Sequence, residues 1–215
     1  MSYEASGPDE KSMPMRQGVL LVISAPSGAG KTSLCQRLIE ILPEMGHSTS
    51  FTTRAPRGEE RDGVDYHFVS SETFALMVEA DEFVEWAEVH GNRYGTAKST
   101  LEQARLGGED LLLEIDCQGA AQIKLAEPES VSIFVLPPSL QELERRLRGR
   151  STDEDAEINR RLMNARVEMQ AVKDYDYVVV NEDFDRALQE LVSIVVAERL
   201  RTSRLQRLPV EDYQP

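Results

Sequence analysis

The sequence has few cysteines, few histidines and no long apolar run. Its two cysteines, Cys35 and Cys117, form no CxxC pair, which excludes a disulfide framework and favours reduced thiols in a cytoplasmic protein. The three histidines, His47, His67 and His90, show no metal-ligand spacing. No run of about 18 apolar residues occurs, so we expect no membrane-spanning segment.

Basic residues are also scarce relative to acidic ones. The chain has 24 Lys and Arg against 38 Asp and Glu, a formal net charge of −14 at pH 7. Such a surface repels polynucleotides and anionic membranes, so we expect no nucleic-acid partner. A small anionic substrate would need a local basic site in so acidic a protein. Clustered arginines are therefore informative here.

The length of 215 residues suits one domain with a full hydrophobic core and a small insertion or lid. The polar stretch 1–17 has no apolar segment of the kind found in signal peptides, and we expect a disordered leader there. We expect the tail 208–215 to be loose as well. The predicted domain therefore spans 18–207, and the sequence leaves its oligomeric state open, a homo-oligomer included.

Four short apolar runs are typical of buried strands: Val19–Ser24, Leu111–Ile115, Val131–Leu136 and Tyr177–Val180. Segments with helical spacing separate and follow them. These predicted helices are Thr32–Leu42, Gln118–Leu125, Ser139–Arg148, Ala156–Val172 and Phe184–Arg204. The alternation of strand and helix predicts an α/β fold, a parallel sheet with helices on both faces.

The pattern changes between residues 48 and 108. Short alternating pieces, Tyr66–Val69 and Phe83–Val89, are separated by turns rich in arginine and glycine. A helix is expected from Ser70 or Ser71 to Ala80. This stretch predicts an inserted α+β lobe with small antiparallel strands, in a core made of 18–47 and 109–207.

A glycine-rich segment links the first predicted strand to the first helix. It is close to the phosphate-loop pattern G-x-x-x-x-G-K-[ST], with Ala25 in place of the first glycine. Backbone N–H groups at a helix N-terminus bind phosphate, Lys31 can reach the β- and γ-phosphates, and the Thr32 hydroxyl can ligate Mg²⁺. A turn that merely caps a helix is the weaker alternative, given the strand before and the helix after. The predicted ATP-binding residues here are Ala25, Pro26, Ser27, Gly28, Ala29, Gly30, Lys31 and Thr32.

Two arginines, Arg54 and Arg57, flank Pro56 in the next loop. The proline stiffens the loop, so the guanidinium groups lose less entropy when they bind. Arginine forks match phosphate oxygens bidentately, which favours a phosphate site over a solvated loop.

With this loop the chain resembles the guanylate kinases. The similarity runs over about 18–204, and its motifs are jointly specific. The matching segments are Ser50–Glu59, Gly63–Val69, Phe83–Ala87, Gly91–Thr96, Ile115–Gly119, Arg146–Arg150 and Val180–Asp183.

The resemblance implies a P-loop nucleoside monophosphate kinase fold: a five-stranded parallel core sheet with helices on both faces, a GMP-binding lobe and a mobile lid over about 146–161. It implies that ATP phosphorylates GMP and dGMP with Mg²⁺ as cofactor, which supplies GDP for GTP synthesis. Asn181 would join the ATP site, and Lys31, Arg146, Arg150 and Arg161 would be catalytic. The implied GMP-binding residues are Ser50, Arg54, Arg57, Tyr66, Glu85, Tyr94, Thr96 and Asp116.

Chemistry alone leaves some of these roles open. Tyr66 and Tyr94 could be half-buried packing residues, and Glu85 could be an exposed strand carboxylate. Asp116 is better explained by function, because it follows a buried strand at the carboxyl edge of the sheet. Glu114 stands where the family commonly has aspartate, and its longer side chain could shift a water-mediated Mg²⁺ contact.

The lid arginines also have a plain explanation, since some can pair with Glu142 and Glu144 at helical spacing. For the whole chain, the rival reading is a guanylate-kinase-like domain that only binds protein partners. Such domains lack an intact P-loop, whereas Gly30-Lys31-Thr32 is present here. A kinase for another small phosphate ester is a second rival.

Overall fold

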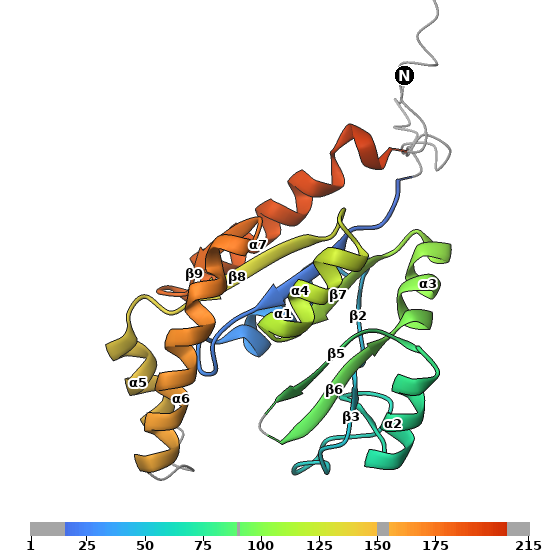
Figure 1. Cartoon of the computed structure of the whole chain (residues 1–215). Helices are drawn as coiled ribbons and strands as arrows, with labels where there is room; N and C mark the ends of the chain where they lie inside the picture. Colours follow the sequence, from blue (N-terminus) through green and yellow to red (C-terminus); the bar gives the residue numbers. More distant parts are fainter. Residues whose placement is uncertain (1–15, 90, 150–154, 206–215) are drawn as a thin grey trace, which may run out of the picture.

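A five-stranded parallel sheet forms the centre of the computed structural model, which describes residues 16–89, 91–149 and 155–205. The strand order is β2-β7-β1-β8-β9, and every neighbouring pair is parallel (Figure 1). The strands are β1 (Leu20–Ser24), β2 (Met45–His47), β7 (Asp110–Glu114), β8 (Val131–Leu136) and β9 (Tyr177–Val180). The predicted α/β fold with a five-stranded parallel sheet is confirmed.

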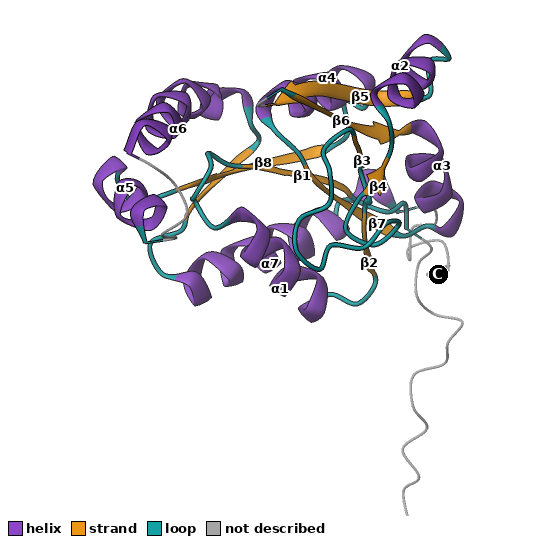
Figure 2. Cartoon of the chain, turned by 90° about the horizontal axis from the view of Figure 1, so that it is seen from below, coloured by secondary structure: helices purple, strands orange, loops and turns teal. Residues whose placement is uncertain are grey.

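Helices cover both faces of this sheet, as predicted. One face carries α1 (Lys31–Ile41) and α7 (Phe184–Arg199), and the other carries α3 (Lys98–Gly107) and α4 (Cys117–Ala126) (Figures 1 and 2). Because β1 lies in the middle of the sheet, consecutive residues along it are buried on opposite faces, which is why it reads as an unbroken apolar run.

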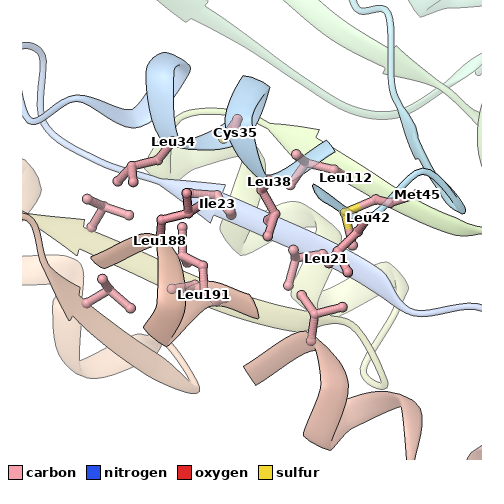
Figure 3. Packing of buried hydrophobic residues seen from close by; sticks show 14 of the residues in the cluster. Leu21, Ile23, Leu34, Cys35, Leu38, Leu42, Met45, Leu112, Leu188 and Leu191 are labelled. Atoms are coloured by element: carbon pink, nitrogen blue, oxygen red, sulfur yellow. The ribbon is translucent and has the colours of Figure 1, made fainter. Parts of the chain in front are cut away.

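Figure 3 shows the larger of the two packing layers, in which Leu21 and Ile23 of β1 lie among side chains from α1 and α7. Val22 points to the other face and packs with Leu113 and Ile123. Each fully buried Leu, Ile or Val contributes about 1.5–3 kcal/mol relative to an exposed one. The two layers hold β1 rigidly, and β1 ends at the phosphate loop.

The inserted lobe contains a second sheet of four strands in the order β4-β3-β6-β5. Its elements are β3 (Phe51–Thr52), β4 (His67–Phe68), α2 (Ser71–Glu79), β5 (Phe83–Val89) and β6 (Asn92–Ala97). The Ser70 side chain caps α2 by accepting a hydrogen bond from the Thr73 amide at 3.1 Å. Most strand pairs are antiparallel, as expected, but β3 and β4 pair in parallel.

Two helices project from the core in the region predicted to be the lid: α5 (Leu140–Arg148) and α6 (Asp155–Glu168) (Figure 1). They pack through a small cluster of their own, built on Leu143, Leu147 and Ile158. This cluster is separate from the two layers of the main sheet, so the pair of helices forms a distinct unit.

Two predicted helices end earlier than the sequence pattern indicated. The α-helix predicted over Ala156–Val172 gives way after Glu168 to a 3₁₀ helix, Met169–Asp174, which leads the chain toward β9. The one predicted over Phe184–Arg204 ends at Arg199, and a separate 3₁₀ turn, Thr202–Arg204, follows. Tertiary contacts override local propensity here, because Arg204 is buried and donates to the Glu129 carbonyl at 2.9 Å.

The N-terminal stretch predicted as a leader lies outside the described residues except for Arg16 and Gln17. Gln17 donates its amide to the Arg204 carbonyl at 2.7 Å. Arg16 pairs with Asp110, a fully buried carboxylate that also accepts from Arg199 at 2.6 Å. Both chain ends of the described domain thus meet at the amino edge of the sheet. The predicted tail lies outside the described residues.

No helix in the described part of the chain is long and apolar enough to cross a membrane. Cys35 and Cys117 are unpaired, as predicted.

Candidate active site

The phosphate loop follows β1 and passes directly into α1, as the sequence predicted. Gly28 and Gly30 have φ angles of 93° and 92°, which a residue with a Cβ rarely adopts. Asn181 lies beneath the loop: its amide donates to the Ala29 carbonyl at 2.8 Å, and a Cβ at Gly30 would stand 2.4 Å from that amide nitrogen. Glycine is therefore required at position 30 both by conformation and by contact.

Lys31 and Thr32 begin α1 with their side chains directed toward the end of β7. The Lys31 ammonium donates to the Ile115 carbonyl at 3.1 Å and lies 3.9 Å from the Glu114 carboxylate. The Thr32 hydroxyl donates to the same carboxylate at 2.6 Å. A cation and two oxygen-bearing side chains thus converge at the carboxyl edge of the sheet, where ligands bind in open α/β folds.

Asn181 was predicted to contact ATP. In the structure it is buried and makes the bracing contact with Ala29 described above. Its contact with ATP therefore stays a prediction.

Two pockets meet at this edge. A pocket of about 270 Å³ is lined by the phosphate loop, and one of about 140 Å³ opens toward the lobe. Lys31, Val89 and Asp116 line both pockets. The second pocket also contains four predicted GMP-binding residues, Ser50, Tyr66, Glu85 and Tyr94.

Glu85 is a buried carboxylate, 4% exposed, and not the exposed strand residue that its sequence context also allowed. The Thr96 hydroxyl donates to it at 2.6 Å. Burial raises the pKa of Glu85 to about 7, and the nearby Asp116 carboxylate adds to the rise. Thr96, predicted to contact guanine, is fully buried and reaches Glu85 instead of lining the pocket.

Asp116 caps the N-terminus of α4 by accepting the Gly119 amide at 2.8 Å. It lines both pockets, and its contact with the substrate stays a prediction.

The predicted phosphate arginines differ from each other. Arg54 is buried and forks onto the Glu60 carboxylate at 2.9 and 3.0 Å, with its guanidinium 5.3 Å from the centre of the Tyr66 ring. The Arg54 bond lowers the pKa of Glu60. Arg57 is exposed, and its backbone amide donates to the Glu60 carboxylate at 2.8 Å. Glu60 was not singled out in the sequence, although the spacing of Arg54 and Arg57 indicated a shared anion.

Tyr66 and Tyr94 meet edge to face, with ring centres 6.0 Å apart. Both line the lobe-side pocket, and burial raises the pKa of Tyr66. Each ring therefore packs against the other and also lines the pocket, and the contact of these tyrosines with a phosphate stays a prediction.

Of the predicted lid arginines that the structure describes, neither Arg146 nor Arg161 lines either pocket. Arg146 donates to Glu142 at 2.8 Å and to the Asn181 carbonyl at 2.9 Å, and Arg161 donates to Glu157 at 3.2 Å. The predicted pairs with Glu142 and Glu144 are thus present, since Arg148 also donates to Glu144 at 2.9 Å, whereas the pair of Arg161 with Glu157 was not predicted. Their consequence is large at Glu142, where Arg145 and Arg146 lower the pKa to about 2. Arg150 lies outside the described residues.

The comparisons with known proteins agree with this geometry. The sequence profile of guanylate kinases matches residues 17–198. The chain is 60% identical over 190 residues to the guanylate kinase of Syntrophotalea carbinolica, covering 88% of this chain and 90% of that one. It is 54% identical over 198 residues to the enzyme of Geobacter metallireducens, covering 92% and 98%. The crystal structure of guanylate kinase from Anaplasma phagocytophilum superimposes with a TM-score of 0.78 at 36% identity, covering 94% of this chain and 97% of that one.

The chain belongs to the guanylate kinase family. The relatives match from end to end and not only at the phosphate loop, so the lobe and the helices α5 and α6 belong to the shared fold.

Glu168 was not among the site residues predicted from the sequence of this guanylate kinase. Glu168, at the end of α6, lines the phosphate-loop pocket and accepts a hydrogen bond from the Ser27 backbone. Burial raises the pKa of Glu168, and the Asp116 carboxylate adds to the rise. No motif marks a lone glutamate at a helix end, so only the fold reveals that it faces the loop.

Proposed function

We propose that this chain transfers the γ-phosphoryl group of ATP to GMP, and to dGMP, and releases ADP and a guanosine diphosphate. The observation that carries the proposal is the meeting of the two pockets at Lys31 and Asp116. A donor bound on the phosphate loop and an acceptor bound in the lobe-side pocket would approach each other at that point.

The chemistry asked of the protein is alignment and charge neutralisation, since phosphoryl transfer needs little covalent help. The phosphate-loop amides and the N-terminus of α1 would hold the β-phosphate of ATP. Lys31 can follow the γ-phosphoryl group, because among the described residues its ammonium contacts the Ile115 carbonyl and, at 3.9 Å, the Glu114 carboxylate. We assign no general base.

The residues fit a magnesium ion. Thr32 and Glu114 offer hard oxygen donors 2.6 Å apart beside the phosphate loop, and Mg²⁺ commonly takes one or two protein oxygens together with phosphates and water. The described residues contain no cluster of three or more side chains of the types His, Cys, Asp and Glu that could hold a metal alone. Bound with ATP, Mg²⁺ would neutralise charge on the β- and γ-oxygens. The glutamate at position 114 keeps the carboxylate that the family pattern has as aspartate.

Acceptor choice would rest on Glu85. Guanine presents N1–H and N2–H₂ donors on one edge, and a single carboxylate can accept from both. Adenine has a bare acceptor at N1, which would leave the buried carboxylate unsatisfied. Arg54, Arg57, Tyr66 and Tyr94 would hold the phosphate of GMP, where Arg54 would exchange its Glu60 partner for phosphate oxygens.

Arg146, Arg150 and Arg161 would close over the transferring group when the lid moves. Closure would exclude water, which could otherwise accept the phosphoryl group. A cytoplasmic location would place the enzyme where nucleotides are recycled toward GTP.

Coupled turnover with ATP and a panel of GMP, dGMP, AMP, CMP and UMP tests the proposal. We expect GMP and dGMP to be used and the others to lag far behind. Turnover with another monophosphate alone would assign a different acceptor. Tight GMP binding without turnover in the presence of Mg²⁺ would favour the catalytically inactive, protein-binding alternative.

A further inference from the structure

The edge of β5 is occupied by a side chain of the core. Strand β5 is the last strand of the lobe's sheet and pairs on one side with β6. On the other side, Gln122 of α4 accepts from the Trp86 amide at 3.2 Å and donates to the Trp86 carbonyl at 2.8 Å. A carboxamide carries one acceptor and one donor, as a peptide group does, so Gln122 replaces a neighbouring strand at this residue.

Glu85 precedes Trp86 on β5, and its carboxylate also lies against α4. A Cβ built on Gly119 would stand 2.4 Å from the Glu85 Oε2 atom. Gly119 precedes Gln122 by three positions, so both belong to one face of the helix. Helix α4 therefore contacts two consecutive residues of β5. The Gln122 amide bonds to Trp86, and Gly119, which has no side chain, leaves room for the Glu85 carboxylate.

These contacts link the core and the lobe, which both line the lobe-side pocket, the proposed acceptor pocket. Asp116 starts α4 and belongs to the core, whereas Glu85 and its partner Thr96 belong to the lobe. The two hydrogen bonds between Gln122 and Trp86 join the core directly to the lobe, next to the Glu85 carboxylate. An error of about 1 Å in the position of a binding group can cost about 10²-fold in rate, so the position of β5 relative to α4 matters.

We propose that Gln122 is a positioning residue for recognition of the acceptor base: it fixes β5 on α4 so that the Glu85 carboxylate occupies the space left by Gly119. The proposal rests on the proposed function, because it takes Glu85 as the group that binds the guanine edge. Gln122 itself lines neither pocket.

Two variants test the proposal, each made in the wild type and in a Glu85→Gln background. Gln122→Leu removes both hydrogen bonds to Trp86. Gly119→Ala adds a methyl group that displaces the carboxylate while it raises helix propensity. Gln189→Leu, an exposed position on α7, is the matched control. The readouts are kcat/KM for GMP and for AMP, the KM for ATP, and the melting temperature.

We expect Gln122→Leu to lower the GMP:AMP ratio of kcat/KM about tenfold, the effect of losing two ordinary hydrogen bonds. Gly119→Ala should lower the same ratio without a loss of melting temperature. The KM for ATP should change less than twofold in both variants. In the Glu85→Gln background neither substitution should lower the ratio further, because both act through the carboxylate.

The outcomes separate the two proposals. If Glu85→Gln leaves the GMP:AMP ratio unchanged, base reading by Glu85 fails, and the account of Gln122 fails with it. If Glu85→Gln lowers the ratio but Gln122→Leu and Gly119→Ala do not, or if their effects persist undiminished in the Glu85→Gln background, only the positioning role is overturned. Should Gln122→Leu not fold, Gly119→Ala decides the matter alone.

Discussion

The two pockets are built from opposite kinds of material. The phosphate-loop pocket, which we propose to be the donor pocket, is formed largely by one continuous segment, Ala25–Ser33. The backbone amides and glycine conformations of this segment define the pocket. The lobe-side pocket, which we propose to be the acceptor pocket, is formed by side chains from several separate strands and loops, and its proposed base recognition depends on the buried carboxylate of Glu85. The phosphate-loop pocket is therefore specified by local sequence. The lobe-side pocket depends on how the lobe packs against the core and on the ionisation of Glu85.

Lys31 belongs to both pockets, so its loss should have the largest effect. We expect Lys31→Ala to lower turnover by about 10³-fold, since a preorganised charge at the developing negative charge is removed. The melting temperature should hardly change. The exposed Lys173→Ala is the control. Near wild-type turnover of Lys31→Ala would refute the role given to the phosphate loop.

Arg161 lines neither pocket in this structure. Its replacement tests whether the predicted lid is a third part of the active site beside the two pockets. Arg160 and Arg161 both pair with Glu157, but their side chains are 57% and 24% exposed. We expect Arg161→Met to lower kcat about 10²-fold, because the lid would bring this charge to the phosphoryl group. Arg160→Met should stay within about twofold, since exposed ion pairs contribute little. Equal effects of the two variants would remove Arg161 from the catalytic set.

Glu85→Gln should affect the acceptor pocket alone. The amide keeps the shape, loses the charge and adds a donor facing the guanine donors. A good bidentate contact contributes about 1–3 kcal/mol, so the GMP:AMP ratio of kcat/KM should fall about 5- to 150-fold. The KM for ATP should not change. The conservative Thr96→Ser, which keeps the hydroxyl on Glu85, should retain selectivity, and a parallel loss of ATP binding in Glu85→Gln would show that the two pockets are not separate.

The pH should distinguish the pockets as well. With a pKa of about 7, Glu85 is mostly ionised at pH 8 and mostly protonated at pH 6, so the GMP:AMP ratio should fall about tenfold over that interval. AMP is the internal control, because its phosphate titrates like that of GMP. A ratio that is flat in wild type, or that still falls in Glu85→Gln, contradicts the assignment.

The raised pKa of Glu85 also affects how the stability of the folded protein depends on pH. A carboxyl with a raised pKa binds its proton more tightly when folded, so it lowers stability as the pH rises from about 4.5 through 7. Glu85→Gln should therefore stabilise the ligand-free protein at pH 8 more than at pH 5. Thermal unfolding of both proteins at the two pH values measures the difference.

Glu168→Gln tests the donor pocket and should have the smallest effect. A bound phosphate would compete with the Glu168 carboxylate for the Ser27 amide and would be repelled by its charge. We expect the KM for ATP to fall about threefold, a typical value for one partly screened charge near a site, and the KM for GMP to stay constant. The exposed Glu102→Gln on α3 is the control. An increase in the KM for ATP would mean that Glu168 supports binding.

Much of the acceptor pocket could be predicted only from a family resemblance. The spacing of Arg54 and Arg57 indicated an anion, but the chemistry of Glu85 alone left an exposed strand residue open. Its burial arises because β5 packs on α4, which no local pattern displays. The short strand β2 was missed for a similar reason: three residues, Met45–His47, are too few to show a period and are strand only because β7 lies beside them.

Local sequence patterns were enough to predict the phosphate loop, the strand and helix that flank it, and the alternating order of strands and helices that leads to a parallel sheet. These features are local, because glycine conformation, helix N-termini and apolar period act within a few residues. Three other features became apparent only in the folded chain: Glu168 faces the loop, Glu60 neutralises Arg54, and Asp110 is buried among arginines. Burial and charge pairing join residues far apart in the chain, so their effects on pKa and position appear only once the chain has folded.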